Sequence, residues 1–432
     1  MAKQEDKIKQ LLAYFSHKII AKYKPLVIGI TGSVGKTSTR HAIAAALSAK
    51  YQLREPEKNF NNEFGIPITI IGAKGVDEGG LKIGGFNFGW LRVFAKGLMV
   101  WLLPQNYPKL LVLEYGIDEP GDMDKLLNIV QPKIGVITTI GLSHKEHFPN
   151  EQAIAVEKGK IAERLPSNGI FVYNIDDAHV KQQTKRTKAH LLSYGKAGSG
   201  NNPEVVLEKI VEQLGAQSST TLYIKSPVRE LKITVPVVGT AHTEAILAAI
   251  AVCEALQMDT ELILKGLANY RAMPGRLNIL AGIKRSILID DTYNAAPLST
   301  TEALHLLDRF PSQHKVAVLG DMLELGDATD AAHAEIGKLA ASLNLQQLVT
   351  VGELGKQIAE AAKQAGMSAD SVISFNNSDE AKRKVLDGLQ PDSVVLIKGS
   401  QGARMEKITK ELLAEPMGAT QSLVRQYGHW LD

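Results

Sequence analysis

Residues 29–40, GITGSVGKTSTR, constrain the fold more than any other stretch of this chain. An apolar run, PLVI, precedes them, and the alanine-rich helical pattern HAIAAALSA follows. A buried strand, a glycine loop and a helix in this order form the Walker A arrangement. Backbone N–H groups of such a loop and the helix N-terminus face phosphate oxygens. The stretch therefore predicts a nucleotide-phosphate site at the end of a strand.

The residue types within the loop suit the same chemistry. Gly32 and Gly35 permit close approach of the backbone to a phosphate. Lys36 is expected to reach the β- and γ-phosphates, and the Thr37 hydroxyl to bind Mg²⁺. The nucleotide-binding residues predicted from this loop are Gly32, Ser33, Gly35, Lys36, Thr37 and Ser38.

Composition excludes several classes of protein. The chain has 432 residues with a formal net charge of +3, which gives no reason to expect nucleic acid as a partner. Its one cysteine, Cys253, excludes a disulfide framework and a zinc ribbon. Residues 1–24 lack the apolar core of a signal peptide and predict one amphipathic helix, so we expect a cytoplasmic protein.

One segment, 86–104, is dense in large apolar residues. Arg92 and Lys96 interrupt it on one helical face, so the segment is too short and too charged for a transmembrane span. Two interpretations stay open. The helix lies on a membrane surface or contacts a partner, or it packs against the body of the protein.

Apolar runs alternate with helical patterns along most of the chain, which predicts an α/β fold with mostly parallel sheets. The strands predicted from these runs are 25–31, 109–116, 133–141, 169–176, 190–195, 286–293, 315–321, 347–352, 371–375 and 393–400. A fresh series of strand–helix units starts after MPGRLN at 273–278. We expect an N-terminal helix at 1–24, a central P-loop ATP-binding domain at 25–273 and a C-terminal Rossmann-like domain at 274–432.

Six further motifs follow the phosphate loop in a fixed order: NNEFGIPITII, LVLEYGIDEPGDM, GVITTIGLSHKEHF with AIAVEKGKI, IDDTYNAAPLS, VLGDMLELGD and LIKGSQGARMEKI. Together they resemble the Mur ligases. IDDTYNAAPLS and VLGDMLELGD are similar to the branch of that family that adds D-alanyl-D-alanine to a peptidoglycan precursor peptide. The resemblance implies an ADP-forming amide ligase. In the family, ATP phosphorylates a peptide carboxylate, and the amine then attacks the acyl phosphate.

The chain departs from the family pattern in two places. Only about 24 residues precede the first predicted strand, so we expect the domain that holds the UDP-sugar in the family to be missing here. In GTAHTEAILAA, His242 stands where the family places an asparagine near adenine, and Ala245 stands at a second asparagine position. We expect His242 to contact the nucleotide, with rebuilt adenine contacts or weaker affinity.

Glu114 ends a predicted strand, at the edge of a parallel sheet that faces ligands, and a carboxylate there suits Mg²⁺. The resemblance implies that His144 is a ligand of a second Mg²⁺, and it assigns no role to His147. Imidazole alone would rank low as a Mg²⁺ ligand. By composition Lys158 is a surface lysine, but the resemblance implies a carbamylated lysine that acts in catalysis.

Candidate substrate residues precede or follow other predicted elements. Asn61 and Asn62 suit either a turn or a loop that positions the peptide, and the resemblance favours the peptide. Asp321 and Glu324 follow a strand and are expected near the incoming amine.

The second predicted domain supplies the remaining candidates. Arg276 follows MPG at the joint between the domains, where a guanidinium could clamp ATP phosphates. Asp290 ends a strand, where a carboxylate can accept from ribose hydroxyls. Tyr293 and Asn294 are expected near the nucleotide. Lys398 ends another strand and either offsets charge at the acyl phosphate or pairs with a carboxylate.

Two other functions stay open. The first is a ligase similar to folylpolyglutamate synthases, which also lack the UDP-binding domain. The second is a non-catalytic ATP-binding protein that docks at membranes through 86–104. For the leading function we expect small peptide and D-Ala-D-Ala-like substrates, a monomer, and ATP with two Mg²⁺ ions.

Overall fold

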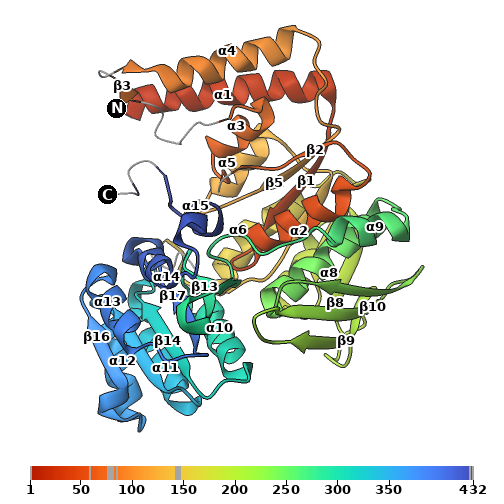
Figure 1. Cartoon of the computed structure of the whole chain (residues 1–432). Coiled ribbons are helices and arrows are strands. Elements are labelled where there is room, and N and C mark those ends of the chain that lie inside the picture. The colour runs from red at the N-terminus through yellow and green to blue at the C-terminus, as the bar shows by residue number, and fades with distance from the viewer. Residues whose placement is uncertain are drawn as a thin grey trace.

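The computed structural model of the chain describes residues 2–57, 60–74, 82–83, 86–141, 147–427 and 430. These residues form two α/β units, each built on its own sheet, as Figure 1 shows. The predicted fold class, a P-loop unit with a mostly parallel sheet followed by a second α/β unit, is confirmed.

The first unit contains a nine-stranded sheet in the order β11-β10-β9-β8-β7-β6-β1-β5-β2. Its strands are β1 (Leu26–Thr31), β2 (Leu53–Arg54), β5 (Leu110–Glu114), β6 (Ile134–Ile137), β7 (Ile170–Asn174), β8 (His190–Lys196), β9 (Val205–Gln213), β10 (Ser219–Lys225) and β11 (Glu230–Val235). The strands from β2 to β9 pair in parallel, and β10 and β11 continue the sheet antiparallel. A separate short hairpin joins β3 (Lys82–Ile83) to β4 (Phe86–Asn87).

Helices cover both faces of this sheet. The helices of the unit are α1 (Ala2–Tyr23), α2 (Lys36–Ser48), α3 (Gly65–Ile71), α4 (Phe88–Leu102), α5 (Asp122–Ile129), α6 (Glu151–Glu163), α7 (Ala178–Gln182), α8 (Thr240–Ala255) and α9 (Thr260–Leu267). Alternate residues of β5 enter different cores. Leu111 and Leu113 pack with α1, α3, α4, α5 and α6, whereas Leu110 and Val112 pack with α2, α8 and α9. Burial on both faces explains why the strands are apolar runs without alternation.

The second unit has a six-stranded sheet in the order β12-β13-β17-β14-β15-β16. It is parallel except for β12, which pairs antiparallel with β13. Its strands are β12 (Asn278–Ala281), β13 (Ile287–Asp291), β14 (Lys315–Gly320), β15 (Gln347–Val351), β16 (Val372–Phe375) and β17 (Val394–Lys398). Its helices are α10 (Pro297–Arg309), α11 (Thr329–Ser342), α12 (Gly355–Gln364), α13 (Ser378–Gly388), α14 (Glu406–Leu412) and α15 (Ala419–Ser422). The boundary predicted at 273/274 falls between α9 and β12 and stays a prediction.

Residues 88–102 of the segment 86–104 form α4, which lies beside α1 along the top of the first unit in Figure 1. Trp90, Val93 and Val100 face the core with Phe15 of α1. The inner side of this helix therefore packs against the body of the protein. Across the described part of the chain, every helix is too short or too polar to span a bilayer.

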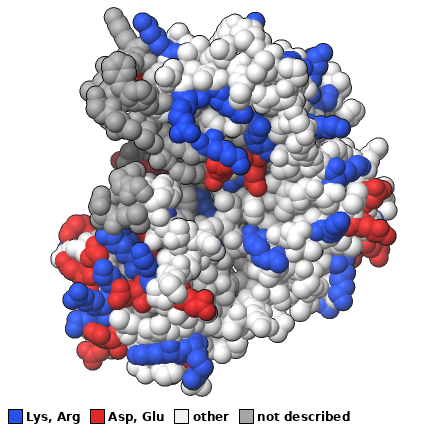
Figure 2. All heavy atoms as spheres, turned by 45° about the horizontal axis from the view of Figure 1, so that its top comes forward, with Lys and Arg blue, Asp and Glu red and all other residues white. Residues whose placement is uncertain are grey.

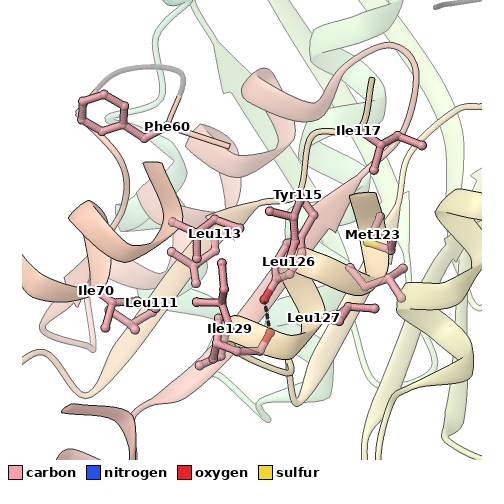
Figure 3. Packing of buried hydrophobic residues seen from close by; sticks show 14 of the residues in the cluster. Phe60, Ile70, Leu111, Leu113, Tyr115, Ile117, Met123, Leu126, Leu127 and Ile129 are labelled. Atoms are coloured by element: carbon pink, nitrogen blue, oxygen red, sulfur yellow. Dashed lines mark hydrogen bonds between the residues drawn. The ribbon is translucent and has the colours of Figure 1, made fainter. Parts of the chain in front are cut away.

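Tyr115 lies in the core directly after β5, where Figure 3 shows it beside Leu126 of α5. Its side chain is fully buried, and its hydroxyl donates to the Val130 carbonyl at 2.8 Å. The ring also fills the space beside Gly29, where an added Cβ would lie 2.8 Å from Tyr115 Cε2. Ring and hydroxyl thus bind together β1, β5 and the end of α5.

We expect Tyr115→Phe to lower the free energy of unfolding by about 1–2 kcal/mol, because the Val130 carbonyl would lose its donor in a buried place. Urea unfolding followed by circular dichroism measures this. The control is Tyr223→Phe on β10, a half-buried tyrosine whose hydroxyl forms no hydrogen bond among the described residues. This substitution should change stability by less than about 0.5 kcal/mol. Equal effects of the two substitutions would contradict the role of the Tyr115 hydroxyl.

Candidate active site

The carboxyl ends of the parallel strands of both sheets border one cavity of about 310 Å³. The phosphate loop and the end of β5 line it from the first unit, and the ends of β13 and β17 line it from the second. Sequence-predicted residues that line it are Ser33, Gly35, Lys36, Thr37, Ser38, Asn61, Asn62, Glu114, His242, Arg276, Tyr293, Asn294, Glu324 and Lys398. Residues far apart in the sequence thus meet where open α/β sheets bind ligands.

The phosphate loop has the predicted strand–loop–helix form, because β1 ends at Thr31 and α2 begins at Lys36. Gly35 has φ 83°, a left-handed conformation. Gly32 cannot carry a side chain without a clash, since an added Cβ would lie 1.9 Å from Thr138 Oγ1. Lys36 Nζ donates to the Gly32 carbonyl at 2.8 Å, and burial lowers the pKa of its ammonium.

Glu114 is the centre of a buried polar cluster at the end of β5. It is 2% exposed, and it accepts from Thr37 Oγ1 at 3.1 Å and from Asn61 Nδ2 at 3.4 Å. Arg40 Nε lies 3.7 Å from its Oε2. Thr37 and Glu114, the two oxygen donors predicted for Mg²⁺, are therefore in contact.

Arg40 was not anticipated from the sequence. It is 1% exposed on α2, and it forms an ion pair with Glu55 and donates to the Pro56 carbonyl at 3.1 Å. The sequence feature that could have indicated a role for Arg40 is its position in KTSTR, four residues after Lys36. A cation there faces the strand end that carries the carboxylate.

The two neighbouring asparagines have different surroundings. Asn61 reaches Glu114, whereas Asn62 Oδ1 accepts from the N–H groups of Phe64 and Gly65 at 3.0 and 2.9 Å. Asn62 therefore fastens the turn that starts α3. Both line the cavity, so contact with a peptide stays a prediction for each.

Lys158 is not a surface lysine. Its side chain is 1% exposed on α6, and burial, together with repulsion from Lys36, holds its pKa well below the ordinary value. Glu114 and Asp118 lie near enough to act on its charge in the opposite direction. The interpretation based on composition alone is wrong, because α6 turns this lysine toward the phosphate loop.

The histidines that follow β6 contribute little to the described site. His144 lies outside the described residues, and His147 is exposed. Among the residues that the structure describes, there is no group of three or more His, Cys, Asp or Glu side chains that could hold a metal ion. A magnesium site would thus combine Glu114 with the hydroxyl of Thr37.

In the second unit, Lys398 and Asp291 form a buried ion pair, with Nζ 2.5 Å from Oδ2. Lys398 Nζ also donates to the Asn294 carbonyl at 3.0 Å. Lys398 is 2% exposed at the end of β17 and still lines the cavity. Pairing with a carboxylate was one of the two predicted interpretations of Lys398.

The predicted ribose contact of Asp290 does not agree with its position. Asp290 is completely buried, and its carboxylate accepts from the Gly275 N–H at 2.8 Å and from Thr292 and Thr409 hydroxyls at 2.8 and 3.2 Å. Burial raises its pKa to about 6. The next residue, Asp291, lines the cavity instead. Successive side chains of a strand face opposite ways, and the sequence places an aspartate at both positions.

Arg276 stacks on Tyr293, with the guanidinium carbon 4.0 Å from the ring centroid. Its Nε is buried without a hydrogen-bond partner, which is the kind of donor that an anion would satisfy. Arg425, which was not singled out from the sequence, binds the backbone beside Tyr293. It donates to the carbonyls of Thr292 and Tyr293 at 3.0 and 2.5 Å.

Two predicted residues follow β14 but differ in exposure to the cavity. Asp321 accepts from the Gly355 N–H at 2.7 Å, and burial raises its pKa. It fastens the neighbouring loop and does not line the 310 Å³ cavity. Glu324 does line it, in a left-handed conformation with φ 65° that is uncommon outside glycine.

His242 sits at the start of α8 with both ring nitrogens engaged. Nε2 lies 2.9 Å from the Arg276 carbonyl, which can only accept, so Nε2 carries the proton. Nδ1 then accepts from the Tyr270 hydroxyl at 2.7 Å. Burial lowers the pKa of His242 to about 4 and keeps the ring neutral. The ring thus joins α8 to the segment between the two units.

A second cavity of about 280 Å³ adjoins the phosphate loop at Val34 and Gly35. Its polar lining includes four carboxylates, Asp176, Asp177, Glu244 and Glu302, together with Lys196. Burial raises the pKa of Glu302 to about 7 and also raises that of Glu244. Sequence reasoning did not single out these side chains.

Comparison with known protein families gives two matches. The Mur ligase middle domain matches residues 98–253, and the Mur ligase glutamate ligase domain matches residues 275–401. Between them they cover more than half of the chain. The chain is also 28% identical over 393 residues to UDP-N-acetylmuramoyl-tripeptide–D-alanyl-D-alanine ligase of Bacillus subtilis (strain 168), which is 90% of this chain and 76% of that protein.

Solved structures agree with this similarity. A crystal structure of MurF from Acinetobacter baumannii matches with a TM-score of 0.75 and 26% identity, over 94% of this chain and 80% of that chain. A Mycobacterium tuberculosis folylpolyglutamate synthase complexed with ADP and AMPPCP matches with a TM-score of 0.65 and 17% identity, over 95% and 98% of the two chains. The latter likeness shows a shared fold alone.

The neutral state of His242 predicts a pH dependence of stability. Because its folded-state pKa is about 4 and the ordinary value is about 6.5, the unfolded chain takes up a proton first as the pH falls. Stability contributed by the neutral ring is present above about pH 6.5 and is lost toward pH 4, by about 3 kcal/mol in all.

Urea unfolding at pH 7.5, 6 and 4.5 measures this loss. His242→Gln should remove this part of the pH dependence, and His190→Gln, at an exposed histidine, should retain it. A His242→Gln profile parallel to that of the unaltered protein would show that folding does not lower the pKa of His242.

Proposed function

Because the chain belongs to the Mur ligase family, we propose that it is an ADP-forming amide ligase that joins D-alanyl-D-alanine, or a similar amine, to a peptidoglycan precursor peptide. One observation carries the proposal. The phosphate loop of the first unit and the cations Arg276 and Lys398 of the second unit line the same cavity. Such an arrangement suits a reaction that brings two anions, ATP and a carboxylate, together.

The reaction proceeds in two steps. A carboxylate oxygen of the peptide attacks the γ-phosphorus of ATP, the bond to the β-phosphate oxygen breaks, and ADP leaves. The amine nitrogen then attacks the acyl carbon, phosphate leaves, and the nitrogen gives up a proton. Lys36 binds the β- and γ-phosphates, and Arg276, through its unpartnered Nε, clamps the phosphates from the second unit.

Mg²⁺ fits the contact between Thr37 and Glu114, whose oxygens are the kind of ligand that this ion prefers. When bound there, the ion would neutralise phosphate charge. We assign His144 to a second Mg²⁺ only on the family resemblance. Asn61, Asn62 and Glu324 line the cavity where the peptide and the amine would lie.

The nucleoside of ATP fits the second cavity, which continues from the phosphate loop. Glu244 and Glu302 there can accept from the exocyclic amine of adenine, and a protonated carboxyl can donate to a ring nitrogen. These carboxyls would replace the asparagines of the family. His242 then acts indirectly, because its two nitrogens already hold Tyr270 and Arg276.

Phosphate release from ATP and Mg²⁺ tests the proposed activity. We expect release that requires both a peptidoglycan precursor peptide and D-alanyl-D-alanine. Lys36→Ala should lower it about 100-fold or more, because phosphate neutralisation is lost. The melting temperature should change little, since the only other interaction removed is the bond from Lys36 Nζ to the Gly32 carbonyl of the loop itself. Lys50→Ala, at an exposed lysine near the end of α2, is the matched control. Release that requires glutamate and a folate would favour a folylpolyglutamate synthase, and ATP binding without turnover of any pair would favour a non-catalytic protein.

We further propose that Lys158 is carbamylated. Its lowered pKa supplies the neutral amine that attacks CO₂, and the product is an anion beside Lys36. With ¹³C-bicarbonate, NMR should detect a carbamate carbon in the unaltered protein and in Lys160→Ala. The signal should be absent from Lys158→Ala. An unmodified Lys158 amine in a crystal grown with bicarbonate would refute the modification.

A further inference from the structure

The outer side of α4 is apolar, although it faces away from the core. The exposed large apolar side chains on α4 and directly after it are Leu91, Leu98, Met99, Leu102 and Leu103, which we call the outer apolar face. Leu91 is 64% exposed and Leu102 59%. Leu91, Leu98 and Leu102 follow one another at helical spacing, so they form a continuous stripe.

Packing among the described residues does not account for this stripe. Trp90, Val93 and Val100 already supply the side of α4 that contacts α1 and α3. A helix that only covered a core would carry polar residues on its other side. A grouped set of exposed large apolar side chains instead marks a contact surface.

Cations border the outer apolar face. Arg92 and Lys96 come from α4 itself, which contains no Asp or Glu. Lys18 of α1 lies over the rings of Tyr14 and Trp101, 5.3 and 5.6 Å from their centroids. The upper part of Figure 2, where α1 and α4 lie, is largely white with blue side chains at its margins.

The helix is firmly attached to the protein. Lys22 Nζ donates to the carbonyls of Trp101 and Leu103 at 2.8 and 2.7 Å, and so satisfies the C-terminal end of α4. Tyr23 donates to the Val100 carbonyl at 3.0 Å. The surface is therefore formed in advance, without ordering a flexible segment.

We propose that the outer apolar face docks on an anionic lipid bilayer, with α4 lying in the plane of the headgroups. Leucine and methionine side chains would enter the acyl boundary, while Arg92, Lys96 and Lys18 would contact lipid phosphates. Charge favours lipid over a second copy of the chain. A symmetric pairing of two such faces would bring their bordering cations together without acidic partners from α4.

Sedimentation of the full chain with vesicles tests this docking. We expect binding to vesicles of phosphatidylglycerol and phosphatidylcholine, with much weaker binding to phosphatidylcholine alone, and a loss of binding as salt rises. Leu98→Ser combined with Leu102→Ser should weaken binding roughly tenfold or more. The matched control, Val228→Ser with Met417→Ser, alters two exposed apolar residues elsewhere and should bind as the unaltered chain does.

A second variant makes the test independent of any folding defect in the first. Arg92→Glu with Lys96→Glu keeps the outer apolar face and should abolish the preference for anionic vesicles. Phosphate release without vesicles should stay unchanged in both variants, since neither touches the cavity. Binding that is equal for all variants, or a dimer in solution that the leucine substitutions dissociate, would overturn the proposal.

Discussion

The contact between Arg40 and Glu114 governs the arrangement of the phosphate loop. Both side chains are almost fully buried where β5 ends against α2. A buried carboxylate without a cation would cost about 3–5 kcal/mol, so Glu114 ties the first turns of α2 to the central strands. Thr37 joins the same carboxylate. The hydroxyl of the loop and the carboxylate are thereby held at the distance that a shared cation requires.

Side-chain contacts from both units hold the segment around Arg276, which connects the two units. His242 of α8 donates from Nε2 to the Arg276 carbonyl, and the Tyr270 hydroxyl donates to Nδ1 and fixes the orientation of the ring. The guanidinium of Arg276 lies on Tyr293 of the second unit. Arg425 then holds the Tyr293 carbonyl. A chain of contacts thus runs from the first sheet to the second through Arg276, whose Nε is buried without a hydrogen-bond partner.

The sequence alone predicted the strands that are buried on both faces and the phosphate loop, because continuous apolar runs and the spacing of glycines are local signals. It did not reveal β9–β11, where Glu230–Val235 alternates polar and apolar residues as a strand with one exposed face does. Asp290 and Asp291 could not be told apart, since which of them faces the cavity depends on the register of β13. By composition Arg40 and Lys158 look like ordinary helix residues, and only the family resemblance singled out Lys158. The packing of α2 and α6 buries both side chains.

The distribution of charge explains why one unit alone would make a poor site for two anionic substrates. Lys36 belongs to the first unit and Lys398 to the second, but Asp291 already pairs with Lys398. Burial and repulsion from Lys36 lower the pKa of Lys158 and so disfavour its charged form. The cation that remains to balance a second phosphate group is Arg276, which stands on the joint itself. Positive potential at the γ-phosphate therefore depends on both units approaching the loop together, and this links the binding of nucleotide to the arrangement of the two sheets.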